Sequence, residues 1–217
     1  MREIFVSPSI LAANFTDMRK AVSEIEKAGA DWIHCDVMDG VFVPNITFGQ
    51  KMVSDIKKIT QLPLDVHLMI MKPEKYVEEF IDCGSSSITI HYESSAVVPQ
   101  ILEKIRERGV KAGISIKPGT DVSALRQYLD AVDMITVMSV QPGFAGQSYM
   151  PEVTEKIAKV KEMIGERQII LQVDGGINTK NIAEVIDAGA DCVVAGSVFF
   201  NSKNKTETVN TLKRLDV

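Results

Sequence analysis

The chain has 217 residues, of which 45% are hydrophobic and 24% are charged, and its formal net charge is −5. This is the composition of a globular protein, and it excludes a disordered or collagen-like chain. The acidic balance, with no Lys/Arg block longer than a pair, argues against a nucleic-acid partner, because a phosphate backbone requires a basic surface.

The N-terminal segment from Met1 to Leu11 is predicted to be a strand, and it lacks the long apolar run of a signal peptide or a membrane span. The three cysteines are odd in number and show no CxxC spacing, and Cys35 and Cys192 lie within apolar runs. We therefore expect reduced thiols in a cytoplasmic protein with no membrane partner.

Short β-branched runs alternate with longer amphipathic segments along the whole chain, which is the pattern of successive βα units. Eight runs are predicted to be strands, at residues 5–11, 32–37, 64–69, 87–91, 111–116, 134–140, 169–173 and 192–195. No long linker separates any two of them. The pattern favours one closed (β/α)₈ TIM barrel over an open sheet with an appended domain, and we expect residues 1–217 to form this single domain.

Four predicted helices end at glycine turns that lead into the next strand: KAGAD at 27–31, DCG at 82–84, ERG at 107–109 and DAGAD at 187–191. Glycine just past a helix end adopts the left-handed conformation that closes the helix, so these turns are assigned to the bottom of the barrel. Helix starts with capping or first-turn residues are predicted at Thr16, Pro73, Pro151 and Asn178. Polar residues between strand ends and helix starts then lie on the top face, which carries function in this fold.

All three histidines, His34, His67 and His91, are predicted to lie at strand ends. His34 and Asp36 are two residues apart, so strand alternation puts both on one side of their strand. His67 on the next strand and Asp174 after the seventh strand add an imidazole and a carboxylate. Two imidazoles and two carboxylates at a barrel mouth predict a site for one divalent cation per chain, Zn²⁺ or Fe²⁺ in preference to Mn²⁺ or Co²⁺.

The role of His91 stays open at the level of sequence. No aspartate lies in phase with it, and Glu93 follows it in a predicted loop. His91 is expected either to support a metal ligand from behind or to have a structural role.

Glycine-containing loops follow the sixth, seventh and eighth predicted strands, and their backbone N–H groups can approach an anion. The residues assigned to the phosphate end of a substrate are Gly143, Phe144, Ala145, Gly146, Gly175, Gly176, Gly196 and Ser197. Ser197 also begins a short predicted helix whose first N–H groups and hydroxyl suit a phosphate. Because late loops are the usual phosphate site of this barrel, we expect a phosphorylated small-molecule substrate.

Three of the ten methionines, Met38, Met69 and Met138, fall at predicted strand ends on the top face. They are either flexible core filling or an apolar lid that excludes water from a reacting carbon.

Six ordered segments resemble the ribulose-phosphate 3-epimerase family over essentially the entire chain. They are SPSILA at 7–12, HCDVMDGVFVPN at 34–45, DVHLM at 65–69, MSVQPGFAGQ at 138–147, VDGGI at 173–177 and DAGADCVVAGS at 187–197. The resemblance implies inversion of C3 of a ketose phosphate through an enediolate, with Asp36 as proton acceptor and Asp174 as proton donor. The implied metal ligands are His34, Asp36, His67 and Asp174. It also implies substrate contacts at Ser9 and His67 and a homo-oligomer, commonly a dimer or hexamer.

Three positions depart from the family pattern: Gln141 stands where Asn is usual, Ala145 where Gly is usual and Lys117 where Asn is common. They lie on the substrate side and not among the ligands. The segments at 173–177 and 196–197 resemble the branch that interconverts D-ribulose 5-phosphate and D-xylulose 5-phosphate, which is the preferred pair. The alternatives are the same chemistry on D-allulose 6-phosphate and D-fructose 6-phosphate, or a non-catalytic phosphosugar-binding barrel.

Overall fold

The computed structural model describes residues 4–213, whose strands form one sheet of eight parallel strands. The strands are β1 (Phe5–Pro8), β2 (Ile33–Met38), β3 (Leu64–Met69), β4 (Ser87–His91), β5 (Lys111–Ile116), β6 (Met134–Met138), β7 (Ile170–Asp174) and β8 (Cys192–Ala195). Their hydrogen-bonded order is β1-β8-β7-β6-β5-β4-β3-β2, so β1 and β2 are the two edges.

These two edges approach each other and almost close the sheet into a barrel. Ser9, just after β1, forms an isolated parallel bridge with His34 of β2. Below this bridge the Asp31 backbone N–H donates to the Val6 carbonyl at 3.0 Å, and the Val6 N–H donates to the Asp31 carboxylate at 2.8 Å. The predicted (β/α)₈ barrel is confirmed.

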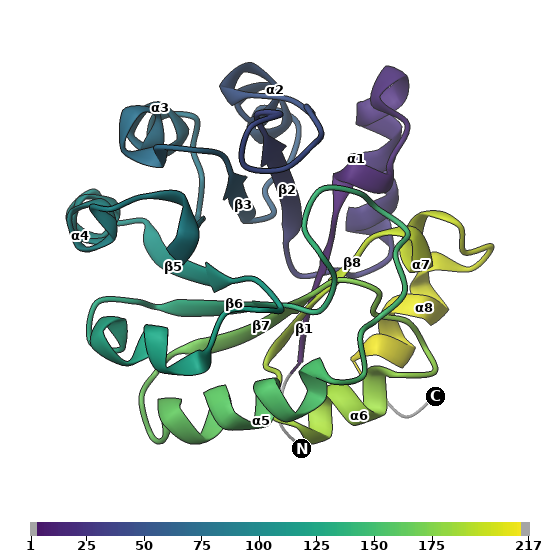
Figure 1. Cartoon of the computed structure of the whole chain (residues 1–217). Helices are drawn as coiled ribbons and strands as arrows, with labels where there is room; N and C mark the ends of the chain where they lie inside the picture. The colour runs from purple at the N-terminus through teal and green to yellow at the C-terminus, as the bar shows by residue number, and fades with distance from the viewer. Residues whose placement is uncertain (1–3, 214–217) are drawn as a thin grey trace.

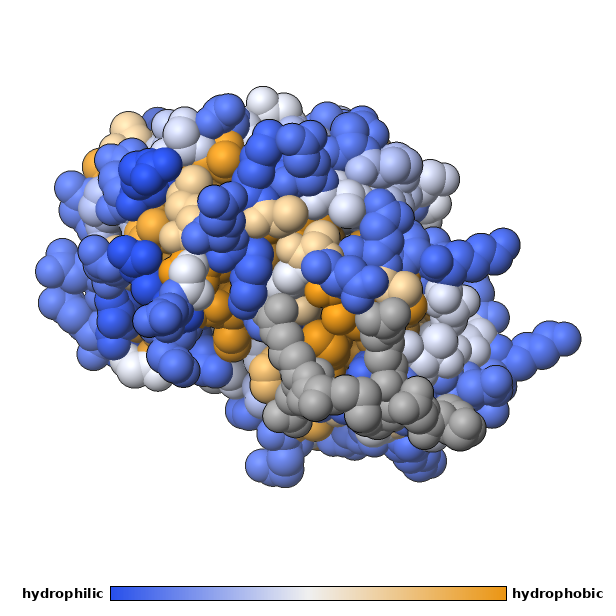
Figure 2. Space-filling view, turned by 90° about the horizontal axis from the view of Figure 1, so that it is seen from below, coloured by the Kyte–Doolittle hydropathy of each residue, from blue (hydrophilic) through white to orange (hydrophobic). Residues whose placement is uncertain are grey.

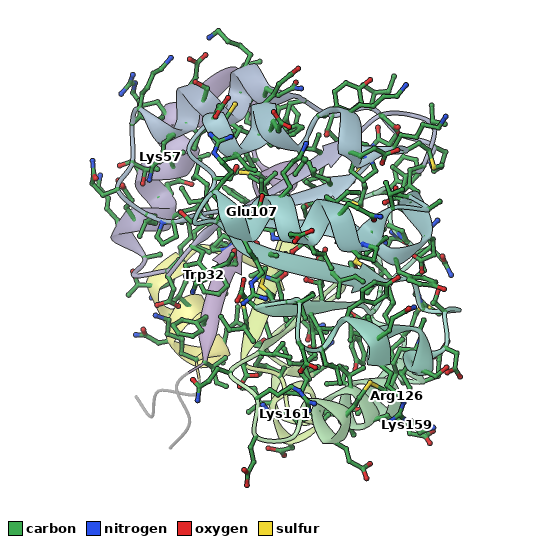
Figure 3. The ribbon with its side chains drawn as sticks, turned by 90° about the vertical axis from the view of Figure 1, so that its left-hand side faces the viewer. Trp32, Lys57, Glu107, Arg126, Lys159 and Lys161 are labelled. Carbon is green, nitrogen blue, oxygen red and sulfur yellow. The ribbon has the colours of Figure 1, made fainter. Side chains whose placement is uncertain are left out.

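Helices form an outer layer around the sheet (Figure 1). They are α1 (Met18–Lys27), α2 (Gln50–Lys57), α3 (Val77–Asp82), α4 (Val98–Glu107), α5 (Val153–Ile164), α6 (Ile182–Asp187), α7 (Ser197–Phe200) and α8 (Lys205–Leu212). Between β5 and β6 the connection is a 3₁₀ helix, η5 (Val122–Tyr128), which packs against α5. Arg126 of η5 and Lys159 of α5 lie on the outside of the molecule (Figure 3).

Alternation along the strands separates an apolar layer from a polar barrel interior. In β2 the residues Ile33, Cys35 and Val37 join the apolar core that packs under the helices, whereas His34 and Asp36 alternate with them. The same alternation leaves buried polar side chains on the other strands: Ser7, Asp65, His67, Ser87, Thr89, His91, Ser115, Thr136, Gln172 and Asp174. The interior therefore offers hydrogen-bonding groups to a site built within it.

Two predicted strands end earlier than expected. The first was predicted to run to Leu11, but β1 stops at Pro8 because the Ser9 hydroxyl accepts the Leu11 N–H and begins a 3₁₀ turn, η1 (Ile10–Ala12). The part of that prediction at residues 1–3 lies outside the described residues. The sixth was predicted to reach Val140, but β6 ends at Met138.

The glycine turns after the helices are confirmed: Gly29, Gly84, Gly109 and Gly189 all have positive φ. Cys35 and Cys192 are buried free thiols, as expected.

Within residues 4–213, no helix combines the length and apolar character needed to cross a membrane. Seen from below, one face shows mostly hydrophilic residues with hydrophobic residues visible between them (Figure 2).

Candidate active site

The four predicted metal ligands converge inside the upper barrel. His34 and Asp36 come from β2, His67 from β3 and Asp174 from the end of β7. One ligand atom from each lies within 4.8 Å of the others. Asp36 Oδ1 is 3.2 Å from both His34 Nε2 and His67 Nδ1, while Asp174 Oδ2 is 3.4 Å from His67 Nδ1 and 3.7 Å from His34 Nε2.

The position of two histidines along their strands differs from the prediction. His34 is the second residue of β2 and His67 is the fourth residue of β3, so neither lies at a strand end. In-phase alternation is what brings them together, because Asp36 pairs with His67 across the β2–β3 register and His34 shares the face of Asp36. His91, by contrast, is the last residue of β4.

Behind His34 lies a buried polar cluster that was not predicted from the sequence. The Nδ1 atom of His34 is 2.7 Å from Asp65 Oδ2, and Gln172 Nε2 donates to the same oxygen at 2.7 Å. Asp65 Oδ1 accepts from Ser87 Oγ at 2.9 Å. The signal was available in the sequence, because Asp65 and Gln172 precede His67 and Asp174 by two residues and so share their faces.

Behind His67 lies His91, whose Nε2 is 2.9 Å from His67 Nε2. Glu93, which the sequence placed in a loop after His91, lies with its Oε2 atom 3.3 Å from His91 Nδ1. Glu93 is in a 3₁₀ turn, η4 (Tyr92–Ser94), that folds back immediately after β4. Glu93 follows His91 by two residues, and the turn keeps the two side chains on the same side of the chain.

The charges in the cluster favour a bound cation. Burial lowers the pKa of His34, but Asp36 and Asp65 outweigh it and hold that pKa well above its usual value. Burial likewise lowers the pKa of His67, and the hydrogen bonds to Asp174 and Asp36 raise it overall. Burial raises the pKa of Asp36, but His34 and His67 hold it below its usual value. The metal-free site thus concentrates positive charge on the imidazoles between two carboxylates, where a divalent cation would otherwise lie.

The donor set fits a transition metal such as Zn²⁺ or Fe²⁺, since imidazole nitrogen and carboxylate oxygen are ligands that these ions accept. His34 and His67 each have their second ring nitrogen hydrogen-bonded to a buried group, which is the usual arrangement behind metal-binding histidines.

A pocket open to solvent lies above this cluster and is lined by Asp36, Asp174 and the predicted phosphate residues. Those residues are Gly143, Phe144, Ala145, Gly146, Gly175, Gly176, Gly196 and Ser197. Ser9 also lines the pocket, and its Oγ donates to Asp36 Oδ2 at 2.5 Å. His67 is buried beneath the pocket and is not among the residues that line it.

Backbone geometry brings the late loops close to this pocket. A side chain at Gly176 would meet the Tyr149 backbone nitrogen at 2.2 Å, so only glycine lets the two loops touch. The loop at 141–147 is held by Gln147, whose Nε2 donates to the Gln141 carbonyl at 2.7 Å and to the Phe144 carbonyl at 3.0 Å. Ser197 begins α7, as the sequence predicted.

Met38, Met69 and Met138 are buried and line the same pocket, which places their side chains beside the acidic residues. Of the three positions that depart from the family pattern, Ala145 lines this pocket, whereas Lys117 and Gln141 are not among the residues that line it. The Lys117 ammonium instead lies 3.8 Å from the centre of the Phe42 ring.

Solved structures share this architecture at low sequence identity. The 3-keto-L-gulonate-6-phosphate decarboxylase of Vibrio cholerae has a TM-score of 0.76 at 15% identity, covering 98% of this chain and 96% of that one. The 3-hexulose-6-phosphate synthase of Salmonella typhimurium has a TM-score of 0.74 at 15% identity, covering 97% of both chains. At such identity the likeness concerns the fold alone.

Closer relatives are found by sequence. The ribulose-phosphate 3-epimerase of Synechocystis is 46% identical over 212 residues, covering 96% of this chain and 92% of that protein. That of Bacillus subtilis is 39% identical, covering 97% and 98%, and the chloroplastic ribulose-5-phosphate-3-epimerase of Arabidopsis thaliana is 44% identical, covering 97% and 76%. The sequence model of the Ribulose-phosphate 3 epimerase family matches residues 5–200. The resemblance in the motifs is therefore confirmed, and the chain belongs to the ribulose-phosphate 3-epimerase family.

Proposed function

We propose that the protein interconverts D-ribulose 5-phosphate and D-xylulose 5-phosphate by inverting the configuration at C3. The observation that carries this proposal is that Asp36 and Asp174, from β2 and β7, line one pocket in a chain of this family. Relatives that the chain covers almost completely are named for the same activity.

One divalent cation per chain is proposed at the cluster of His34, Asp36, His67 and Asp174. Zn²⁺ and Fe²⁺ suit this set best, with Mn²⁺ and Co²⁺ as alternatives. When bound, such a cation stabilises the negative charge that develops on the substrate carbonyl oxygen as the C3 proton leaves.

The two carboxylates move the proton. Asp36 accepts the C3 proton from one face of the substrate, which leaves a planar enediolate, and Asp174 donates a proton to the opposite face. In the reverse reaction the two residues exchange roles. The Ser9 hydroxyl donates to Asp36 Oδ2, and this hydrogen bond orients the carboxylate toward the pocket.

The remaining pocket residues bind and shield the substrate. Backbone N–H groups at Gly176 and at the start of α7, together with the Ser197 hydroxyl, hold the phosphate. Binding energy from this remote end fixes C3 between the carboxylates. Met38, Met69 and Met138 form an apolar cover that keeps water away from the reacting carbon.

Steady-state assays of metal-loaded protein on the five-carbon and six-carbon ketose phosphates test the proposal. We expect turnover of the ribulose/xylulose pair to exceed that of the allulose/fructose pair. A preference for the six-carbon pair would reassign the substrate. If neither pair is epimerised, the remaining alternative is a non-catalytic barrel that binds phosphosugars. His34→Ala should lose the metal measured by elemental analysis, and full activity in verified metal-free protein would contradict the metal site.

We also propose that the chain forms a single domain and acts in the cytoplasm as a homo-oligomer, either a dimer or a hexamer. Family membership supports this assembly. Light scattering coupled to size-exclusion chromatography measures the mass directly, and a monomer at micromolar concentration would contradict it.

A further inference from the structure

His67 and His91 meet through the same atom of each ring, Nε2, at 2.9 Å. The rings are nearly parallel, with centroids 5.0 Å apart and an interplanar angle of 21°. Both side chains are fully buried, and His91 does not line the substrate pocket. His91 can therefore act only through the residues around it, not on the substrate.

A hydrogen bond between two such nitrogens needs one donor and one acceptor. The contacts of Glu93 determine which of the two histidines is the donor. Glu93 Oε1 accepts from the Lys117 backbone N–H at 2.9 Å and also from the Thr120 hydroxyl. Its other oxygen, Oε2, faces His91 Nδ1 at 3.3 Å. A carboxylate with these partners only accepts, so His91 carries its proton on Nδ1 and has a lone pair on Nε2.

The donor between the two rings is then His67, whose Nε2 must carry the proton. In the neutral ring this leaves a lone pair on Nδ1, the atom that faces Asp36 Oδ1 at 3.2 Å and Asp174 Oδ2 at 3.4 Å. A lone pair among carboxylate oxygens is favourable only with a cation between them.

We propose that His91 and Glu93 are positioning residues that hold His67 in the tautomer whose Nδ1 binds the metal ion. The inference rests on the metal site of the proposed function and assigns a role to two residues outside the ligand set. The surroundings keep the arrangement fixed: the Phe42 ring packs against His91 with centroids 4.7 Å apart. Lys156 of α5 holds the loop that carries the two donors to Glu93, through the carbonyls of Lys117, Pro118 and Thr120.

The two imidazole ligands thus bind through opposite ring nitrogens. His34 turns Nε2 toward the site because Asp65 lies behind Nδ1, whereas His67 turns Nδ1 toward it because His91 lies behind Nε2. A merely structural His91 would need only to fill its place in the barrel, and the direction of its hydrogen bonds would not matter. The tautomers of the histidines and the affinity for zinc therefore distinguish a positioning role from a structural one.

Nitrogen-15 NMR of the Zn²⁺-loaded wild-type protein reads the tautomers directly, and the chain has just three histidines to assign. We expect His67 to be ligated at Nδ1 and protonated at Nε2, and His91 to be protonated at Nδ1. A proton on His91 Nε2 with zinc bound would overturn the inference while leaving the metal site in place. A wild-type protein that binds no zinc would instead remove the proposed metal site and this inference with it.

Glu93→Gln tests the direction of the hydrogen bonds with an isosteric change. The backbone N–H of Lys117 requires the amide oxygen at the Oε1 position, so the amide NH₂ turns toward His91 Nδ1. His91 then carries its proton on Nε2 and forces the His67 proton onto Nδ1, where the metal should bind. We expect Zn²⁺ affinity, measured by competition with a chelating dye, to fall about 10- to 100-fold.

Glu74→Gln is the matched control, since it removes the same charge from a carboxylate whose one hydrogen bond within residues 4–213 is accepted from the Ser95 hydroxyl, at 2.8 Å. Its zinc affinity should stay within about twofold of wild type. Equal affinity in Glu93→Gln and Glu74→Gln, with both folded by circular dichroism, would overturn the inference. If Glu93→Gln does not fold, the tautomers of the wild-type protein give the decision alone.

Discussion

His34 Nδ1 lies 2.7 Å from Asp65 Oδ2, and both side chains are buried within the barrel. Asp65 also accepts hydrogen bonds from Ser87 and Gln172, so it has no role as a donor. When a cation displaces the Nε2 proton, His34 therefore keeps its proton on Nδ1 and offers the Nε2 lone pair on the side of Asp36, whose Oδ1 is 3.2 Å away. Three strands, β3, β4 and β7, hold the carboxylate that orients a ligand on β2.

The first prediction concerns Asp65. Asp65→Ala removes the acceptor of three buried donors, on His34, Gln172 and Ser87. We therefore expect Zn²⁺ affinity to fall about 10- to 100-fold and the free energy of unfolding to fall by about 1–3 kcal/mol. Asp65→Asn keeps an amide oxygen that can accept from His34 and Gln172. Its losses of Zn²⁺ affinity and of unfolding free energy should therefore be much smaller. Dye competition and urea unfolding measure the two effects. Indistinguishable zinc affinity in the two variants would show that the buried acceptor does not orient His34.

The second prediction separates the two carboxylates. With Asp174→Asn, the Asp36 face should still exchange the C3 proton of one epimer with deuterated solvent while net inversion nearly stops. Asp36→Asn should show the mirror pattern, starting from the other epimer. NMR of each pure epimer in heavy water follows both exchange and inversion.

Both aspartates are also proposed ligands, so the metal content of each variant must be measured alongside. Only a variant that still holds its metal ion tests the role of the aspartate in proton transfer. If a loaded variant still inverts C3 near the wild-type rate, its aspartate is not an essential acid or base.

Much of this site could be predicted from the sequence, because period-two alternation puts His34 and Asp36 on one inward face whatever the exact strand ends. The position of His34 and His67 within their strands was not predictable, because strand tilt and stagger decide how deep each residue lies in a barrel. Asp65 and Gln172 were missed although they share faces with ligands.

The contact between Glu93 and His91 could not be predicted from alternation. It depends on the turn η4, which continues the inward face after the strand has ended. Likewise, the early end of β1 depends on one local hydrogen bond, from the Leu11 N–H to the Ser9 hydroxyl, which competes with strand pairing.

The third prediction is that metal binding releases protons. Burial lowers the pKa of His34 and of His67, but the carboxylates around them outweigh it, so both pKa values are raised in the metal-free protein. Below those raised values each imidazole holds a proton that the cation must displace. Apparent Zn²⁺ affinity should therefore rise with pH, by about tenfold per unit for each displaced proton, and level off above the raised pKa values.

Titrations with Zn²⁺ between about pH 5.5 and 8.5, with proton uptake by the buffer measured calorimetrically, check this sign. The same linkage acts on metal-free stability, where the raised pKa values contribute stability at low pH that is lost as pH rises through them. Zinc affinity that is constant across the range would contradict protonated imidazoles in the free site.

The fourth prediction separates backbone strain from steric contact in the phosphate loops. Gly176 has φ +66°, and a Cβ there would lie 2.2 Å from the Tyr149 nitrogen and 2.6 Å from its Cα, so the backbone of the neighbouring loop would have to move. Gly29 has a similar φ of +77° but nothing within 4 Å of an added Cβ. We expect Gly29→Ala to cost about 1 kcal/mol of unfolding free energy and to leave KM unchanged.

Gly176→Ala should reduce the free energy of unfolding by more than Gly29→Ala does and should raise KM severalfold, because the displaced loop also shapes the pocket that holds the phosphate. Urea unfolding and steady-state kinetics on both variants give the comparison. Equal stability losses with an unchanged KM would mean that the close approach of these loops contributes nothing to the phosphate site.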